Sequence, residues 1–149
     1  MPDPLLDDLV SGDAGRIHSA VWAIIRARDP VVLDPLASAL AEIRSATADV
    51  DLGGIVFPNR ASLAFALRKL EHHRDRAGCL CALYPGLLLI DPEREAEAGH
   101  VRILGVTKIQ DRWIDSYSCE CTACGARFEV KEGESHYTWW QWTPRTVGA

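Results

Sequence analysis

The sequence predicts an α+β protein, in which an N-terminal bundle of three or four helices is followed by a mostly antiparallel β-sheet. In the first half, apolar residues recur every three or four positions, and Asp-Pro pairs and glycines separate the periodic segments. After Gly78 the pattern changes to short alternating runs joined by polar turns, which is typical of strands. We therefore expect a helical unit over residues 1–77 and a β-rich unit over residues 78–149.

Three Asp-Pro pairs are expected to mark helix boundaries in the first half. The pairs at residues 3–4 and 34–35 are expected to begin helices, because an aspartate caps free N–H groups and proline suits the first helical position. The pair at residues 29–30 is expected to end the helix that Asp13 caps, because the residue before a proline avoids the α region.

Apolar stripes predict the buried faces of these helices. The helix expected after Asp34 has a stripe made of Leu33, Leu36, Leu40 and Ile43. A further helix is expected to begin with Asn59 as its cap and to end near Gly78, with a stripe made of Leu63, Ala66, Leu67 and Leu70. If Leu67 lies in the core, its truncation to alanine should cost about 2–5 kcal/mol.

The stretch from Asp13 to Ala46 is similar to a single HEAT-type helical repeat. The similarity rests on Arg16-Ile17, Ala20 and Ile24, on the Asp-Pro turn, and on Pro35-Leu36 and Leu40 in the second helix. It implies a helical hairpin that acts as a packing scaffold or presents a concave face to a peptide or protein.

Six strands and one acidic turn of helix are expected in the second half. The strands are predicted at residues 79–84, 87–91, 101–109, 113–121, 126–131 and 136–143. Between the second and third of these, residues 91–99 combine Asp-Pro with Glu93, Glu95 and Glu97, which indicates an exposed acidic turn of helix.

Composition and charge restrict the class of protein. The 149 residues are 48% apolar and 25% charged, as in ordinary folded domains. The net charge of −5 makes a nucleic-acid partner unlikely and suits a basic one, since nucleic-acid binders usually carry a basic stripe. The apolar runs are far too short to span a bilayer, and the acidic N-terminus lacks the cationic start of a signal peptide. The sequence therefore predicts a cytoplasmic protein that does not engage a membrane.

The cysteines suggest a metal site. Five cysteines occur in two short groups, an arrangement more typical of metal ligands in a reducing compartment than of disulfides. Cys121-x-x-Cys124 followed by glycine has the spacing of a zinc knuckle, because two thiolates three residues apart can bind one ion. We predict a structural zinc ion (Zn2+) with four ligands, Cys79, Cys81, Cys121 and Cys124.

Other assignments of the cysteines stay open at this point. The spacing of Cys79 and Cys81 is tight, so Cys119 could replace either of them, and His100 and His136 are further available ligands. The thiols could instead pack as small hydrophobic groups or act in redox chemistry.

The run from Cys121 through Gly125 into the following alternating residues resembles the second knuckle of a zinc ribbon. The first half-site departs from that pattern, because it is C-x-C and a long insertion separates it from the second. The resemblance implies a zinc-ribbon-like sheet, a structure found both in nucleic-acid machinery and in protein-binding modules.

The sequence contains none of the common catalytic signatures. It has no H-E-x-x-H, no G-x-S-x-G, no glycine-rich phosphate loop and no H-x-E of a zinc deaminase. A zinc ion with four sulfur ligands would leave no position open for a substrate. We therefore expect a non-catalytic binding protein.

Aromatic residues suggest where a partner could bind. In the segment from His136 to Trp142, strand alternation places Trp139 on one face and Trp140 on the other. One face is expected to pack under the sheet, and the other either packs against the helical half or forms a contact hot spot, because tryptophan is over-represented in such spots.

A small, acidic, cytoplasmic protein with exposed aromatic residues resembles, in general character, the bacterial immunity proteins that neutralise toxins. The resemblance implies stoichiometric occlusion of a basic toxin or effector such as a nuclease, with acidic side chains facing it. The residues expected at the contact are Glu93, Glu95, Glu97, Trp139 and Trp140. The alternatives are a zinc-ribbon protein associated with nucleic acid or transcription, and an enzyme whose Asp or His groups form no recognisable motif.

Overall fold

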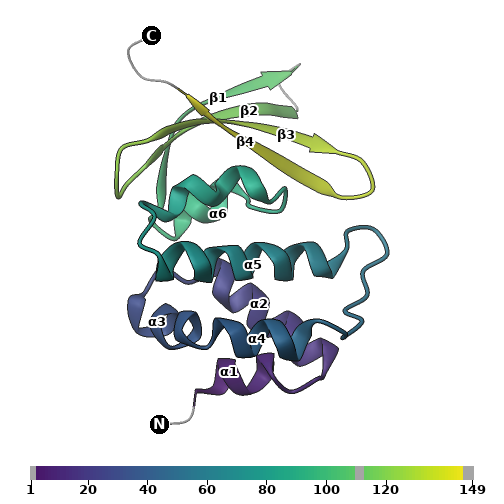
Figure 1. Cartoon of the computed structure of the whole chain (residues 1–149). Coiled ribbons are helices and arrows are strands. Elements are labelled where there is room, and N and C mark those ends of the chain that lie inside the picture. The colour runs from purple at the N-terminus through teal and green to yellow at the C-terminus, as the bar shows by residue number, and fades with distance from the viewer. Residues whose placement is uncertain (1–2, 110–112, 146–149) are drawn as a thin grey trace. The chain divides into compact units, whose positions relative to one another are not determined.

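The computed structural model describes residues 3–109 and 113–145 and has the α+β architecture expected from the sequence (Figure 1). Helices occupy the N-terminal part, and one four-stranded antiparallel sheet occupies the C-terminal part. The chain divides into two compact units, a helical unit of residues 1–80 and a β-rich unit of residues 81–149. Among the described residues, none of the helices has both the length and the apolar character needed to cross a bilayer.

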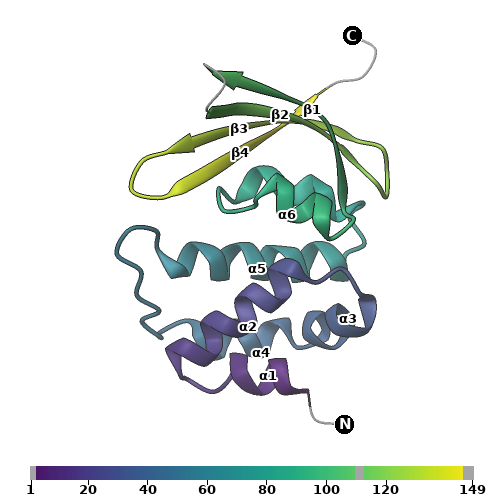
Figure 2. The same ribbon diagram turned by 180° about the vertical axis from the view of Figure 1, so that it is seen from behind.

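Five α-helices form the helical unit, and aspartates begin three of them. Asp3, Asp13 and Asp29 each accept hydrogen bonds from backbone N–H groups in the first turn that follows. Both α2 and α3 pack against the long helix α5, and Figure 2 shows α2 crossing it. The helices are α1 (Pro4–Leu9), α2 (Ala14–Arg26), α3 (Pro30–Ser38), α4 (Leu40–Thr47) and α5 (Asn59–Arg74).

Two predicted helix starts are wrong. The pair at residues 29–30 ends α2 and also begins α3, because Asp29 caps the N–H of Val31 and Pro30 takes the first helical position. The pair at residues 34–35 therefore lies inside α3, and the chain breaks at Ala39 instead. Asn59 is not a cap but the first residue of α5, and its side-chain amide donates to the Leu52 carbonyl.

The predicted apolar stripes form the core of the helical unit. Leu33, Leu36, Leu40 and Ile43 are all buried, as are Leu63, Ala66 and Leu70 of α5. Leu67 differs from its neighbours on the stripe, because it is only partly buried and packs at the margin of the core. The helix predicted after Asp34 is thus divided between α3 and α4. Its buried residues are nevertheless those that the apolar spacing predicts.

A buried lysine closes the end of α2. Lys69 of α5 is 4% exposed, and its ammonium group donates to the carbonyls of Ile25 and Ala27 at 2.9 and 2.5 Å. The carbonyls at a helix C-terminus lack partners within the helix and carry partial negative charge, so a cation there satisfies both needs. This contact ties α5 to α2 and also compensates for the burial of the charge.

The β-rich unit is a meander of four antiparallel strands in the order β1-β2-β3-β4. One face of the sheet is apolar, with Tyr117, Val130 and Trp142 paired in one row and Cys119 and Phe128 in the next. The strands are β1 (Val101–Ile109), β2 (Trp113–Cys121), β3 (Arg127–Glu134) and β4 (Thr138–Arg145).

Residues 80–98 cover the apolar face of the sheet. This covering segment contains the 3₁₀ helix η1 (Leu80–Gly86) and the helix α6 (Pro92–Glu97), which confirms the expected acidic turn (Figure 1). Tyr84 stacks on Trp142 with ring centroids 4.2 Å apart and meets Phe128 edge-on at 5.7 Å. The indole N–H of Trp142 donates to the Ile90 carbonyl at 2.8 Å.

The covering segment corrects the prediction of strands at residues 79–84 and 87–91. Its buried side chains, Cys81, Tyr84, Leu87 and Ile90, recur every three residues, which is the repeat of a 3₁₀ turn and not of a strand. Pro85 also lacks the N–H that a strand in a sheet would use. The other four predicted strands are confirmed, with shifts of up to three residues at their ends.

The difference between Leu70 and Leu67 can be tested by truncation. We expect Leu70→Ala to lower the free energy of unfolding by about 2–5 kcal/mol, because it empties a fully buried position. Leu67→Ala should cost clearly less, because part of its side chain already faces water. Urea unfolding followed by far-ultraviolet circular dichroism measures both changes, and equal losses would mean that the two leucines are buried alike.

Candidate metal centre

The structure brings together the four cysteines selected from the sequence. The sulfur atoms of Cys79, Cys81, Cys121 and Cys124 all lie within 4.8 Å of one another. The sulfurs of Cys81 and Cys124 are 3.5 Å apart. Cys81 comes from η1, Cys121 ends β2, and Cys124 lies in the turn between β2 and β3. Four thiol groups this close together can hold a metal ion.

The turn from Cys121 to Ala126 positions two of these sulfurs. The N–H of Cys121 donates to the Ala126 carbonyl at 2.8 Å, and the N–H of Gly125 donates to the Cys121 carbonyl at 2.9 Å. Gly125 has a φ of 79°, a left-handed conformation that other residues adopt only at a cost. The glycine therefore lets the chain return into β3 while both thiols of the knuckle face the same cluster.

The chemistry of the cluster is that of a closed site. None of the five cysteines forms a disulfide, and in the cluster Cys81 and Cys121 are buried while Cys124 is exposed. The knuckle continues into strand β3 and not into a helix, so it lacks the helix N-terminus that activates the thiols of redox C-x-x-C motifs. Four protein sulfurs would complete a tetrahedral shell and leave no position for a substrate.

Cys119 lies outside the cluster. Its side chain is fully buried in the sheet, where it pairs with Phe128 on one side and Ile103 on the other. Burial raises the pKa of the Cys119 thiol to about 11, so the group stays neutral at ordinary pH. Cys119 therefore packs as a small apolar side chain. Within the described residues, neither His100 nor His136 belongs to the cluster.

Glu93, Glu95 and Glu97, the acidic residues expected at a partner contact, lie in different surroundings. Glu93 and Glu97 are exposed on α6. The carboxylate of Glu95 is half-buried and accepts a hydrogen bond from the Tyr84 hydroxyl at 2.7 Å. Glu95 therefore stabilises the covering segment, and two of the three glutamates point to solvent.

The two tryptophans expected at a partner contact are both half-buried on β4. The indole N–H of Trp140 donates to the Glu132 carboxylate at 2.8 Å on the neighbouring strand. Trp139 packs over Gly133, and its ring occupies the position that a Cβ at residue 133 would take. Any residue other than glycine at position 133 would displace this ring.

The loop between α4 and α5 presents apolar residues that are not among the site residues predicted from the sequence. In this loop, residues 50–58, Ile55 is fully exposed and Val56 is 52% exposed. Backbone and side-chain hydrogen bonds hold the base of the loop, from Asn59 to the Gly53 and Leu52 carbonyls and from Gly53 to Asp51. A Gly-Gly pair is typical of a turn, but only the structure shows that the apolar tip faces water.

Two further contacts stabilise the shape of this loop. The Arg60 guanidinium donates to the carbonyls of Thr47 and Val50. Gly54 has a φ of 97°, and a Cβ there would meet the Phe57 carbonyl oxygen at 2.4 Å, so only glycine fits. The exposed tip therefore stands on a base with a defined conformation.

Comparison of the chain with protein families, with curated proteins and with solved structures finds no match.

The metal centre can be tested by analysis of purified protein. Protein prepared without added metal should contain about one equivalent of metal ion per chain, because one four-thiolate shell binds one ion. Cys124→Ser should lose that ion, while Cys119→Ala is the matched control and should keep it, since Cys119 lies outside the cluster. Elemental analysis decides between these results. Metal-free, fully reduced wild-type protein would contradict the assignment, as would loss of the metal in the Cys119 variant alone.

Proposed function

We propose that this chain is a non-catalytic binding protein of the immunity type, which blocks a basic toxin or effector by forming a stoichiometric complex. The observation that carries the proposal is the loop of residues 50–58, which holds two aliphatic side chains in water on a hydrogen-bonded base. Ordered apolar side chains gain free energy when a partner covers them, and little ordering entropy is lost because the loop is already shaped.

Acidic side chains beside the apolar tip favour a basic partner. Asp49 and Asp51 are exposed at the start of the loop, and the whole chain has a net charge of −5. Glu93 and Glu97 add exposed negative charge on α6. A surface of this sign speeds encounter with a positively charged protein, and the apolar tip of the loop then supplies the short-range contact.

In this proposal the cysteine cluster binds structural zinc. Zinc prefers a tetrahedral shell with metal–sulfur bonds of about 2.3 Å, which separates neighbouring sulfurs by about 3.8 Å. Sulfur positions within 4.8 Å of one another need only small adjustments to reach that shell. The role would be to hold a small β-rich unit together, because binding energy at such a site is folding energy. Cysteines without disulfides and a thiolate metal site also suit the reducing cytoplasm of a bacterium.

The competing function, a zinc-ribbon protein that binds nucleic acid, receives less support. Arg102 and Arg127 on the outer face of the sheet both contact Glu120, which holds the pKa of that carboxyl below its usual range through the hydrogen bonds they donate. Arg145 contacts Glu129. These arginines are therefore paired with acidic neighbours and do not form the open basic stripe that binds phosphates.

The proposal predicts a basic partner whose binding depends on the loop. Tagged wild-type protein should capture such a partner from its native host, and Ile55→Asp combined with Val56→Asp should abolish the capture, because charged groups would be buried in the contact. The partner should be toxic when expressed alone in a bacterial host and harmless when co-expressed with the wild-type chain. Rescue by the loop variant at equal abundance would contradict the role of the loop.

The charge component of the proposal can be measured separately on the purified pair. Association should slow as salt increases, because exposed charges are screened beyond about 10 Å at 0.1 M ionic strength. Asp49→Asn with Asp51→Asn, and separately Glu93→Gln with Glu97→Gln, should lower the association rate, and the pair with the larger effect marks the side that faces the partner. A nucleic acid as the captured partner, or rates that ignore both salt and these carboxylates, would overturn the proposal.

A further inference from the structure

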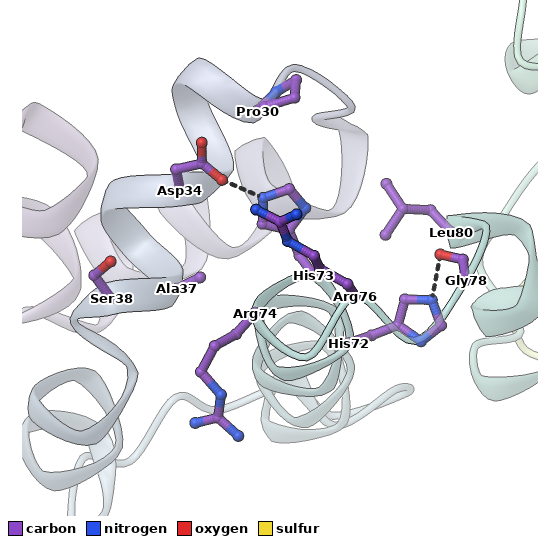
Figure 3. A pocket seen from close by; sticks show the side chains of 10 residues that line it. All are labelled: Pro30, Asp34, Ala37, Ser38, His72, His73, Arg74, Arg76, Gly78 and Leu80. Atoms are coloured by element: carbon purple, nitrogen blue, oxygen red, sulfur yellow. Dashed lines mark hydrogen bonds and ion pairs between the residues drawn. The ribbon is translucent and has the colours of Figure 1, made fainter.

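A cavity of about 580 Å³ lies between α3 and the C-terminal end of α5, entirely within the helical unit (Figure 3). Pro30 and Ala37 of α3, with Leu80 after α5, form an apolar part of its lining. The remaining lining is polar or charged and comes mainly from the last turn of α5 and the turn that follows. Both the volume and the mixture of apolar and polar lining suit a small organic molecule.

Hydrogen bonds hold the two histidines of the cavity in place. The Nε2 atom of His73 donates to the Asp34 carboxylate at 2.5 Å, which joins α5 to α3 across the wall of the cavity (Figure 3). The Nε2 atom of His72 donates to the Gly78 carbonyl at 3.0 Å and so holds the turn after α5. The Asp34 carboxylate is therefore already engaged by a neighbouring side chain.

The arginines of the cavity differ in their partners. Arg74 pairs with Asp75 at 2.9 Å, and this hydrogen bond raises the pKa of Arg74 and lowers that of Asp75. Arg76 is exposed, and within the described part of the chain its guanidinium has no hydrogen bond or ion pair. With Arg74 balanced by Asp75, Arg76 supplies a positive charge that forms no ion pair with a described residue.

Arg76 also has an unfavourable backbone conformation. Its φ is 50°, and every other described residue with a positive φ is a glycine. Arg76 stands directly after the cap of α5, where its N–H and that of Ala77 donate to the His73 and His72 carbonyls. Glycine is the usual residue at this position of a helix end, because it adopts the left-handed conformation without strain. The sequence thus has an arginine where glycine would be more stable, and such departures are expected at functional sites.

We propose that this cavity binds a small organic anion, whose phosphate or carboxylate group contacts the Arg76 guanidinium and whose apolar part lies against Pro30, Ala37 and Leu80. The guanidinium presents a planar set of N–H donors that matches both anionic groups, and it has no competing partner among the described residues. The proposal stands independently of the loop and of a protein partner, so failure of one leaves the other intact.

Three simple probes test the sign of the ligand and distinguish its anionic group. Phenyl phosphate and benzoate carry the two anionic groups on the same apolar ring, and benzyl alcohol is the uncharged control. In a two-dimensional amide NMR titration, at least one anion should cause saturable shifts at Asp34, Ser38 and His73, and benzyl alcohol should not. Equal binding of benzyl alcohol, shifts at other residues only, or no saturable shift with either anion at millimolar concentration would overturn the proposal.

The variant Arg76→Gly separates function from stability. It should weaken binding of the anion about tenfold or more, because it removes a charged hydrogen-bonding group. The same change should raise the midpoint of thermal unfolding, because glycine relieves the left-handed backbone. Arg26→Ala, an exposed arginine of the same unit outside the cavity lining, is the matched control and should leave binding unchanged. Unchanged anion binding in Arg76→Gly would contradict the role of the guanidinium.

Asp34→Asn distinguishes an anion site from a cation site. It removes a negative charge from the wall, so binding of the anionic probe should be equal or tighter than in the wild type. A cation site would lose its principal acidic group in the same variant. Loss of probe binding in Asp34→Asn, with the fold intact by circular dichroism, would therefore argue against an anion held by Arg76.

Discussion

The β-rich unit depends on covering one apolar face of a four-stranded sheet with only a short stretch of chain. Residues 80–98 provide that cover through the stacking of Tyr84 on Trp142 and the hydrogen bonds from β4 to the Leu88 and Ile90 carbonyls. A core this small supplies limited stability, and small domains commonly add a metal or a disulfide. Cys81 brings the start of the covering segment next to Cys121 and Cys124, so the cysteine cluster lies where a metal would hold that cover on the sheet.

This constraint also determines which surfaces remain for recognition. The apolar face of the sheet forms the core of the β-rich unit and is not available to a partner. Trp142 is buried on this face, and the indole N–H of Trp140 donates to Glu132. On the outer face, Arg102 and Arg127 are neutralised by Glu120. These arginines therefore leave no open basic patch between them on the described part of the sheet. Two features that no internal role explains lie in connections of the helical unit, at the loop of residues 50–58 and at the turn after α5.

Both of these connections depart from the local preferences of their residues, whereas the surrounding helices follow theirs. The loop exposes Ile55 and Val56 on a base that several hydrogen bonds hold, and the turn places an arginine in a conformation that favours glycine. By contrast, Lys69 satisfies the end of α2 and the aspartate caps satisfy three helix starts. When most of a chain is locally consistent, functional sites are expected at the few departures.

Features that depend on local chemistry could be predicted from the residues alone. Aspartate caps located α1 and α2, apolar spacing identified the buried side of the helices, and alternation located four strands. The spacing of Cys121 and Cys124 before Gly125 likewise predicted the knuckle, because that turn is set by residues close together in the chain.

Features that depend on residues distant in the chain could not be predicted in this way. The apolar run after Cys79 is compatible with strands in sequence. In the structure it covers the sheet, and every third side chain of the run is buried against the apolar face. Strand alternation puts Cys119 and Cys121 on the same face of the sheet. Cys119 comes two residues before Cys121 in β2, so it lies opposite Phe128 and outside the cluster. The exposure of the Ile55 side chain and the lack of an ion pair at Arg76 were likewise not predictable from the sequence. Both depend on which other segments pack nearby and not on the residue itself.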